Sequence, residues 1–256
     1  MSKRKHSKGT PKGGEIIRFE HSNMMLLKSK PGYEEIFRLA RCLRFCQKLD
    51  GHHMDVSYRF SLNYDGKESK VGDLVIPATE RDISIVTWIP AEGEEWFKST
   101  SLDLDECRQF FSEGYQNIKL SAGAPRCCIT KENDELLKVI QRYFTREGRF
   151  NMVYAYHIRL LMHFTGLKAL NLPYFLHRSI GKMAGKIQGN PKNFESRLFH
   201  YGLIKLLIVK ELEKRKKTWG FFLEKLGYQL MTPISLKDKG ASSYDGIRAS
   251  TPRKKK

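Results

Sequence analysis

The chain has 256 residues, of which 46 are Lys or Arg and 28 are Asp or Glu, so its formal net charge at pH 7 is +18. This length is enough for one globular domain with a sizeable hydrophobic core. No stretch approaches the roughly 20 uninterrupted apolar residues that a membrane-spanning helix needs. The basic start, MSKRKHSKGTPKGG, is not followed by the apolar region of a secretory signal. We therefore expect no membrane association, and the positive charge favours a polyanionic partner such as nucleic acid.

The charge is distributed unevenly along the chain. Residues 1–64 hold 13 basic and 6 acidic residues (net +7), whereas residues 65–118 hold 5 basic and 12 acidic residues (net −7). Residues 119–256 hold 28 basic and 10 acidic residues (net +18). The C-terminal half therefore carries most of the net positive charge, and the middle of the chain is acidic.

Cysteine usage and the basic ends bear on the compartment. The five cysteines are an odd number at spacings that do not suggest a secreted disulfide framework, which indicates a reducing compartment. The clusters Lys3–Lys5 and Arg253–Lys256 resemble nuclear import signals, although such runs also occur as solvated tails. We expect a nuclear or cytoplasmic protein, and the basic ends favour the nucleus.

Composition divides the chain into four segments. Residues 1–14 and 231–256 are rich in Lys, Arg, Ser and Gly, and we expect both to be disordered basic tails. Residues 15–125 should contain an N-terminal helix, a β-hairpin and the acidic segment. Residues 126–230 should form a helical bundle with a basic face.

The first expected helix covers Tyr33–Leu49 and follows the break at Pro31-Gly32. Its apolar positions recur every three or four residues and should face the core. They are Ile36, Leu39, Leu43 and Cys46.

A β-hairpin is expected around Asp65-Gly66, a dipeptide that favours tight turns. Before it, the residues Val56, Tyr58, Phe60 and Leu62 alternate with polar positions, as in a half-buried strand. After it, VGDLVIPAT at 71–79 supplies the second strand. We expect this hairpin to be the one sheet of the chain.

Two short helices should follow the hairpin. Thr79 and Asp82 have the spacing of a capping box, so a helix should start there, run through Trp88 and end before Pro90. A second short helix is expected over Leu104–Ser112.

From Lys131 onward helical periodicity dominates. We expect helices over 131–147, 152–164, 173–188 and 194–217, followed by a short one over 219–226. The helix at 152–164 is apolar on nearly every face, which is typical of the central helix of a bundle. The fold class is therefore mostly α, a bundle of about six to eight helices with one small β-hairpin in the N-terminal third.

The word order of these segments carries a family resemblance. The order is GRFNMVYAYHIRLLMHFTG, then LNLPYFLHRSIGKMAGKIQ, then LFHYGLIKLLIVKELEKRKKTW. It resembles the plant transposon protein domain found in retrotransposon-derived, gag-like plant open reading frames, and FSLNYDGKESKVGDLVIPATERDISIVTWIPAEGEEWFK looks like the upstream part of the same proteins. The resemblance covers about residues 56–226. It implies a mobile-element lineage and no assigned chemistry.

The sequence contains no motif that favours an enzyme. It lacks the acidic triad of a retroviral-type integrase, the paired aspartates of a polymerase, a phosphate loop and the serine elbow of a hydrolase. We therefore expect a non-enzyme with no catalytic residues and no cofactor.

Metal sites are also not expected. Cys42 and Cys46 precede His52-His53, but structural zinc usually uses pairs spaced as CxxC and HxxxH, so core cysteines are the favoured interpretation. Cys127 and Cys128 are adjacent, which makes joint binding of one metal awkward. Glu92, Glu94 and Glu95 lack the spacing of a calcium loop and should form a solvated acidic face.

Four histidines are candidates for a metal site, a core position or a contact with nucleic acid. His157 and His163 are six positions apart, not the four of a helical zinc pair, and should lie in the core or a groove. His177 and His200 lie in basic, aromatic-rich helices, where they either stabilise a helix interface or contact nucleic acid. His177 is the better nucleic-acid candidate, because basic residues adjoin it.

The candidate nucleic-acid-binding residues are the Lys and Arg side chains of the last two long helices. They are Arg178, Lys182, Lys186, Arg197, Lys205, Lys210, Lys214, Arg215, Lys216 and Lys217. Each contact with a phosphate would release counterions and make binding steeply salt-dependent. An ordinary solvated helix face is the alternative explanation of the same pattern.

Two functional hypotheses follow. The first is a non-catalytic protein that binds nucleic acid without sequence specificity, since no base-reading motif is present. The second is a self-assembling, gag-like module in which the acidic residues 65–118 contact the basic half of another copy, giving a homo-oligomer.

Overall fold

The computed structural model describes residues 27, 30, 32–49, 53–97, 102–116, 118, 120, 123–145, 151–191 and 200–228. Within them the chain forms ten α-helices. The first five are α2 (Tyr33–Leu39), α3 (Leu43–Lys48), α4 (Met54–Leu62), α5 (Glu80–Thr87) and α6 (Leu104–Cys107). The others are α7 (Lys131–Phe144), α8 (Ala155–Phe164), α9 (Leu172–Gly189), α10 (Tyr201–Lys214) and α11 (Trp219–Lys225). The mostly α fold expected from the sequence is confirmed.

Two short antiparallel ladders accompany the helices. Strand β1 (Glu68–Val71) pairs with β2 (Leu74–Pro77), and this pair is the expected hairpin in the N-terminal third. Strand β3 (Ala124–Pro125) pairs with β4 (Met152–Val153), a second ladder that the sequence pattern does not predict. The expected disordered tails, residues 1–14 and 231–256, lie outside the described residues.

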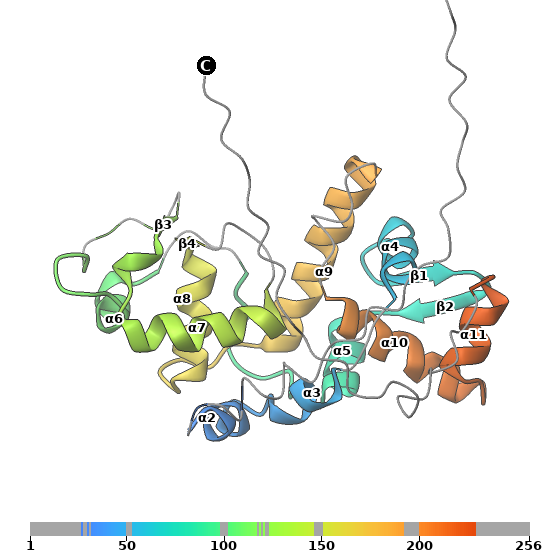
Figure 1. The fold of residues 1–256 in the computed structure, drawn as a ribbon, viewed down its shortest axis with the longest axis horizontal. Helices are drawn as coiled ribbons and strands as arrows, with labels where there is room; N and C mark the ends of the chain where they lie inside the picture. Colours follow the sequence, from blue (N-terminus) through green and yellow to red (C-terminus); the bar gives the residue numbers. More distant parts are fainter. Residues whose placement is uncertain are drawn as a thin grey trace, which may run out of the picture.

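Figure 1 shows how the elements are arranged. Helices α6, α7 and α8 with the β3–β4 ladder lie at one end, and the β1–β2 hairpin with α11 lies at the other. Helices α5, α9 and α10 lie between them: α4 and α5 both pack against α9, and α10 packs against α5 and β2. Elements from 15–125 and from 126–230 therefore share one hydrophobic core.

Helix α8 is the buried centre of its end of the molecule, as its sequence predicts. Every residue from Ala155 to Met162 is buried, as is Phe164. The fully buried Phe37 of α2 packs its ring 4.7 Å from that of Phe164, and Phe144 of α7 approaches the same ring at 5.4 Å. Packing against both α2 and α7 accounts for a helix that is apolar on nearly every face.

The first strand expected for the hairpin is wrong, because residues 54–62 form helix α4. The buried residues of α4 are Val56, Ser57, Phe60 and Ser61, a helical pattern in which two of the four core positions are serines. The Ser61 hydroxyl donates to the Ser57 carbonyl at 2.8 Å, so this buried hydroxyl is satisfied within the helix. The true hairpin turn is Gly72-Asp73, and Asp65-Gly66 instead joins α4 to β1.

The first expected helix is divided into α2 and α3 at Arg41, whose φ of 56° is left-handed. This bend lets Phe37 of α2 and Phe45 of α3 both enter the core, where each is at most 1% exposed. Cys46 faces inward as expected, whereas Leu39 of the predicted stripe is 68% exposed. Dividing this helix and adding α4 turns the eight helices read from the sequence into ten.

Several helix ends follow the capping chemistry of the sequence. Thr79 accepts from the Asp82 backbone N–H at 3.3 Å, and Asp82 accepts from the Thr79 N–H at 3.2 Å, so the capping box of α5 is confirmed. Asn171 accepts from the Tyr174 N–H at 3.0 Å and starts α9. Helix α8 begins later than expected, because Met152 and Val153 form β4.

Many carboxylates of the acidic segment 65–118 are bound by cations of the same chain. The fully buried Arg159 of α8 donates to Glu94 Oε2 at 2.7 Å and to the Lys168 and Ala169 carbonyls at 2.9 Å each. Five more acids of this segment form ion pairs; these are Asp73, Asp82, Glu92, Asp105 and Glu106. Half of the twelve acidic residues of the segment are therefore paired with cations inside the molecule.

Candidate nucleic-acid interface

Helix α9 presents three of the predicted cations in one row, the α9 row of Arg178, Lys182 and Lys186. A helix rises about 1.5 Å per residue, so side chains four positions apart stand about 6 Å apart along its axis. Arg178 and Lys182 are exposed and Lys186 is partly exposed. The opposite side of α9 is fully buried through Leu176, Ile180, Met183 and Ile187. The row therefore occupies the more exposed side of α9.

The hairpin side of the molecule fixes the orientation of α9. His177 lies 2.9 Å through Nε2 from the Gly66 carbonyl, and Gln188 donates to the Ser61 and Tyr64 carbonyls at 3.0 and 2.8 Å. Burial and the charge of Asp65 raise the pKa of Tyr64, and the charge of Arg178 opposes that shift. His177 therefore stabilises the contact of α9 with its neighbour, which is one of the two roles that the sequence suggests for it.

The predicted cations of α10 gather at its C-terminal end, the α10 end of Lys214–Lys217. Arg215 and Lys216 are exposed, Lys214 pairs with Glu211 at 2.7 Å, and the Lys217 ammonium lies 5.8 Å from the Phe221 ring centre. Cations here complement the negative end of the helix dipole. This cluster therefore has a stabilising role of its own in addition to any binding role.

Two other predicted cations of α10 contact the protein itself. Lys205 is partly exposed and its ammonium lies 5.7 Å from the Trp219 ring centre. Lys210 donates to Asp82 Oδ1 at 2.6 Å, and the two side chains are only 16% and 17% exposed. Lys210 therefore joins α10 to the start of α5, and we remove it from the set of candidate phosphate contacts.

The α9 row and the α10 end are two surfaces, not one continuous ridge. Helix α10 starts beside α9, where His200 Nε2 lies 2.9 Å from Ser179 Oγ. It then runs away from α9 toward α11 (Figure 1), and its 14 residues span about 21 Å. His200 is buried in this helix contact, and Arg197 lies outside the described residues.

Sequence reasoning missed a third basic cluster, the α3 groove of Arg38, Arg41, Arg44 and Lys48. All four side chains are exposed, and they line a hollow of about 640 Å³ together with Leu43 and Gln47. The Arg44 guanidinium stands 4.2 Å from the centre of the Trp88 ring, which is 41% exposed at the end of α5. Their spacing of three, three and four residues places cations on one helix face, but it coincides with the apolar stripe of the same segment and does not stand out from it.

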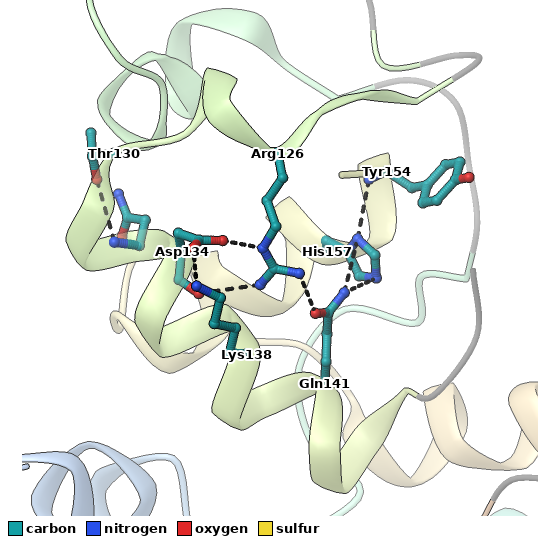
Figure 2. Close-up of polar contacts among 8 residues, drawn as sticks. Arg126, Thr130, Asp134, Lys138, Gln141, Tyr154 and His157 are labelled. Atoms are coloured by element: carbon teal, nitrogen blue, oxygen red, sulfur yellow. Dashed lines mark hydrogen bonds and ion pairs between the residues drawn. The ribbon is translucent and has the colours of Figure 1, made fainter. Parts of the chain in front are cut away.

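A buried polar cluster near α7, shown in Figure 2, superficially resembles a catalytic site. Arg126 donates to the Asp134 carboxylate and, at 2.8 Å, to Gln141 Oε1. The Gln141 amide lies 2.8 Å from His157 Nε2, and the Tyr154 N–H lies 3.2 Å from His157 Nδ1. Each side chain is thus held by another part of the fold, and His157 is fully buried. The cluster ties the β3–β4 region and α8 to α7.

A second hollow, of about 610 Å³, brings His163 and Glu92 to one wall beside Arg41. His163 Nδ1 accepts from the Leu170 N–H at 3.1 Å, so in the neutral ring the proton is on Nε2. Burial lowers the pKa of His163 to about 4, and the ring is therefore neutral at pH 7. The lone pair of His163 Nδ1 already accepts a hydrogen bond, and Glu92 pairs with Arg41 at 3.1 Å. His163 and Glu92 are therefore poorly arranged for acid–base chemistry.

The cysteines are dispersed. Cys42, Cys46, Cys107 and Cys128 are buried and Cys127 is exposed, and all five are free thiols. Burial raises the pKa of Cys42 and of Cys46, which favours the protonated, unreactive form. Among the described residues no group of three His, Cys, Asp or Glu side chains is arranged to hold a metal ion.

Comparisons with known proteins identify no relative: no family model, no curated protein and no solved structure matches this chain. Among the helices of the described residues, none combines the length and the apolar character required to cross a bilayer.

Proposed function

We propose that this protein is a non-catalytic protein that binds nucleic acid without sequence specificity. The observation that carries the proposal is the α9 row, three cations one helical turn apart on the more exposed side of a helix whose other side is buried. Side chains so placed reach successive phosphates while their helix stays fixed by its buried face. The α10 end adds Arg215 and Lys216 as a second, separate set of contacts.

The net charge of +18 supports this proposal more than a protein partner. Self-assembly through the acidic segment 65–118 is the alternative. Six of its carboxylates already pair with cations of the same chain, so fewer remain for a second copy. A mobile-element lineage, which the word order of the sequence suggests, fits a nucleic-acid-binding role in the nucleus.

The test compares two triple variants that each remove three positive charges. One replaces the α9 row by Gln (R178Q/K182Q/K186Q). The control replaces three exposed cations at the α6–α7 end, Arg108, Lys131 and Lys138. Binding of a labelled duplex is measured by fluorescence anisotropy across a salt series.

The α9-row variant should bind more weakly, and the slope of log K against log salt should fall by about 2 to 3, since each phosphate contact contributes about 0.9. The control should change the slope by less than about 1. Equal losses in both variants would show that total charge, not the α9 row, drives binding. Absence of binding by the wild-type protein at low salt would exclude the proposed function.

A further inference from the structure

The α3 groove combines charge and an aromatic surface in a way that the α9 row does not. Its four cations come from the end of α2, the bend at Arg41 and the outer face of α3. Among the residues that the structure describes, two carboxylates pair with this set: Glu35 with Arg38, and Glu92 with Arg41 at 3.1 Å. Both pairs are largely exposed, so they are weak and leave the groove able to accept an anion.

Trp88 forms the aromatic part of this surface. It ends α5 with a left-handed φ of 57°, a conformation that is unfavourable for a bulky residue. Internal hydrogen bonds hold this turn: Thr87 Oγ1 accepts from the Ile89 N–H at 3.3 Å, and Ser84 donates to the Ile89 carbonyl at 2.7 Å. This turn presents a large indole that is 41% exposed, whereas most of the surface of a Trp side chain is usually buried.

The cations of α3 stand over this ring. The Arg44 guanidinium lies 4.2 Å and the Lys48 ammonium 6.0 Å from its centre. Phosphate-binding groups and a flat apolar surface for a ring therefore lie side by side.

We propose that the α3 groove binds single-stranded nucleic acid, with a base stacked on Trp88 and the backbone phosphates held by Arg38, Arg41, Arg44 and Lys48. This inference rests on the proposed function and specifies its substrate class. A base that replaces Arg44 over the ring frees the guanidinium for a phosphate. In a duplex the faces of the bases are covered by their neighbours, so the stacking contribution is available only from an unpaired strand.

The experiment measures the binding of the full chain to a labelled oligothymidylate of about 12 nucleotides, a length within the range of single-strand sites. A duplex of the same length is measured in parallel. Trp88→Ala should weaken single-strand binding about 5- to 100-fold, the range that loss of one stacked base gives. Duplex binding should change less than about 2-fold.

Three further variants keep this test independent of folding. Trp88→Phe retains a ring and should recover most single-strand affinity. Ile85→Ala removes an apolar side chain of α5 that is 50% exposed and has no role in the proposed stack, so it should leave the single-strand affinity unchanged. Arg44→Gln with Lys48→Gln alters exposed positions only and should lower the single-strand salt slope by about 1 to 1.5, since each contact contributes about 0.7. Melting curves identify any variant that fails to fold.

The outcomes separate this inference from the proposed function. Unchanged single-strand binding by Trp88→Ala, or an equal loss of affinity for single strand and duplex, would contradict the proposed single-strand site in the α3 groove. Neither result would bear against the α9 row. Displacement of the oligonucleotide by polyglutamate of equal charge, as efficiently as by unlabelled oligonucleotide, would also overturn it. Nucleic-acid binding that depends on Trp88 but not on the α9 row would support the proposed site in the α3 groove and contradict the role proposed for the α9 row. Wild-type protein that binds neither nucleic acid would overturn both.

Discussion

Replacing Lys210 by Met tests the assignment of this cation to the fold and not to the nucleic-acid surface. Its ammonium lies 2.6 Å from Asp82 Oδ1 and 3.9 Å from Glu211 Oε1. Both carboxylates are at least four-fifths buried, with 17% and 10% of their side chains exposed. Met preserves the length of the side chain and removes the charge.

The magnitude follows from what the variant leaves behind. Removing one partner of a buried ion pair costs about 3–5 kcal/mol, because the other charge remains buried. Asp82 keeps hydrogen bonds from Thr79 and its place in the first turn of α5, and Glu211 keeps Lys214. We therefore expect a loss of about 2–3 kcal/mol, or about 5 to 10 °C in Tm for a domain of this size.

Urea unfolding of the full chain measures this loss, with Lys214→Met as the control. Lys214 is 57% exposed in its pair with Glu211, so the control should lose no more than about 1 kcal/mol. The duplex salt slope of Lys210→Met should equal that of the wild type within about 0.5, less than one phosphate contact contributes. Equal stabilities of the two variants, or a slope reduced as in the α9-row variant, would refute the reasoning.

The same pair predicts the direction of a pH effect. Burial raises the pKa of Asp82, but hydrogen bonds from Lys210 and Thr79 outweigh this, and the net pKa lies below the usual 3.8. Stability from a lowered carboxyl pKa is present above 3.8 and is lost as the pH falls through the folded-state value. The difference between wild type and Lys210→Met should therefore shrink below pH 3.8, and a difference that grows there would contradict this assignment.

Other positions give further expectations for the fold. Gly93→Ala should cost about 2–4 kcal/mol, because its φ is 99° and an added Cβ would lie 2.9 Å from backbone; Gly185→Ala, in open space on α9, should stabilise by about 0.5–1 kcal/mol. Urea unfolding distinguishes the two, and effects of the same sign would be inconsistent with this packing. Arg126→Met should cost about 2–3 kcal/mol because it leaves a buried carboxylate with one cation, whereas Lys138→Met should cost at most about 1 kcal/mol, so similar losses would argue against the network. A thiol reagent should modify Cys127 quickly in the native protein, and rapid reaction of a second cysteine would show that the core is less closed.

The sequence predicts helices best where one face is continuously apolar. The α7 stripe of Leu136, Val139, Ile140 and Phe144 is buried as expected, and so is the stripe of α9. It fails at α4, because positions 56 and 60 fit both a helical and an alternating pattern and the serines between them hide the buried side. It also fails at Arg41, where the chain bends without glycine or proline.

The candidate site was partly predictable for a related reason. Periodicity identifies a row of cations on one helix, which is why Arg178, Lys182 and Lys186 were found together. Periodicity gives no information on how deeply a side chain is buried, so the sequence does not distinguish the largely buried Lys210 from its exposed neighbours. The α3 groove depends on Trp88, which is 44 residues from Arg44 in sequence, and contacts at that separation need the tertiary structure.

The packing of α4 and α5 against α9 and α10 has a consequence for how the chain folds during synthesis. Residues 53–97 leave the ribosome long before their partners at 172–214, and Gln188 hydrogen-bonds to carbonyls about 125 residues earlier. Contacts this distant slow folding, because a large loop must close before they form. The apolar faces of α4 and the hairpin must therefore stay uncovered until α9 and α10 have been made.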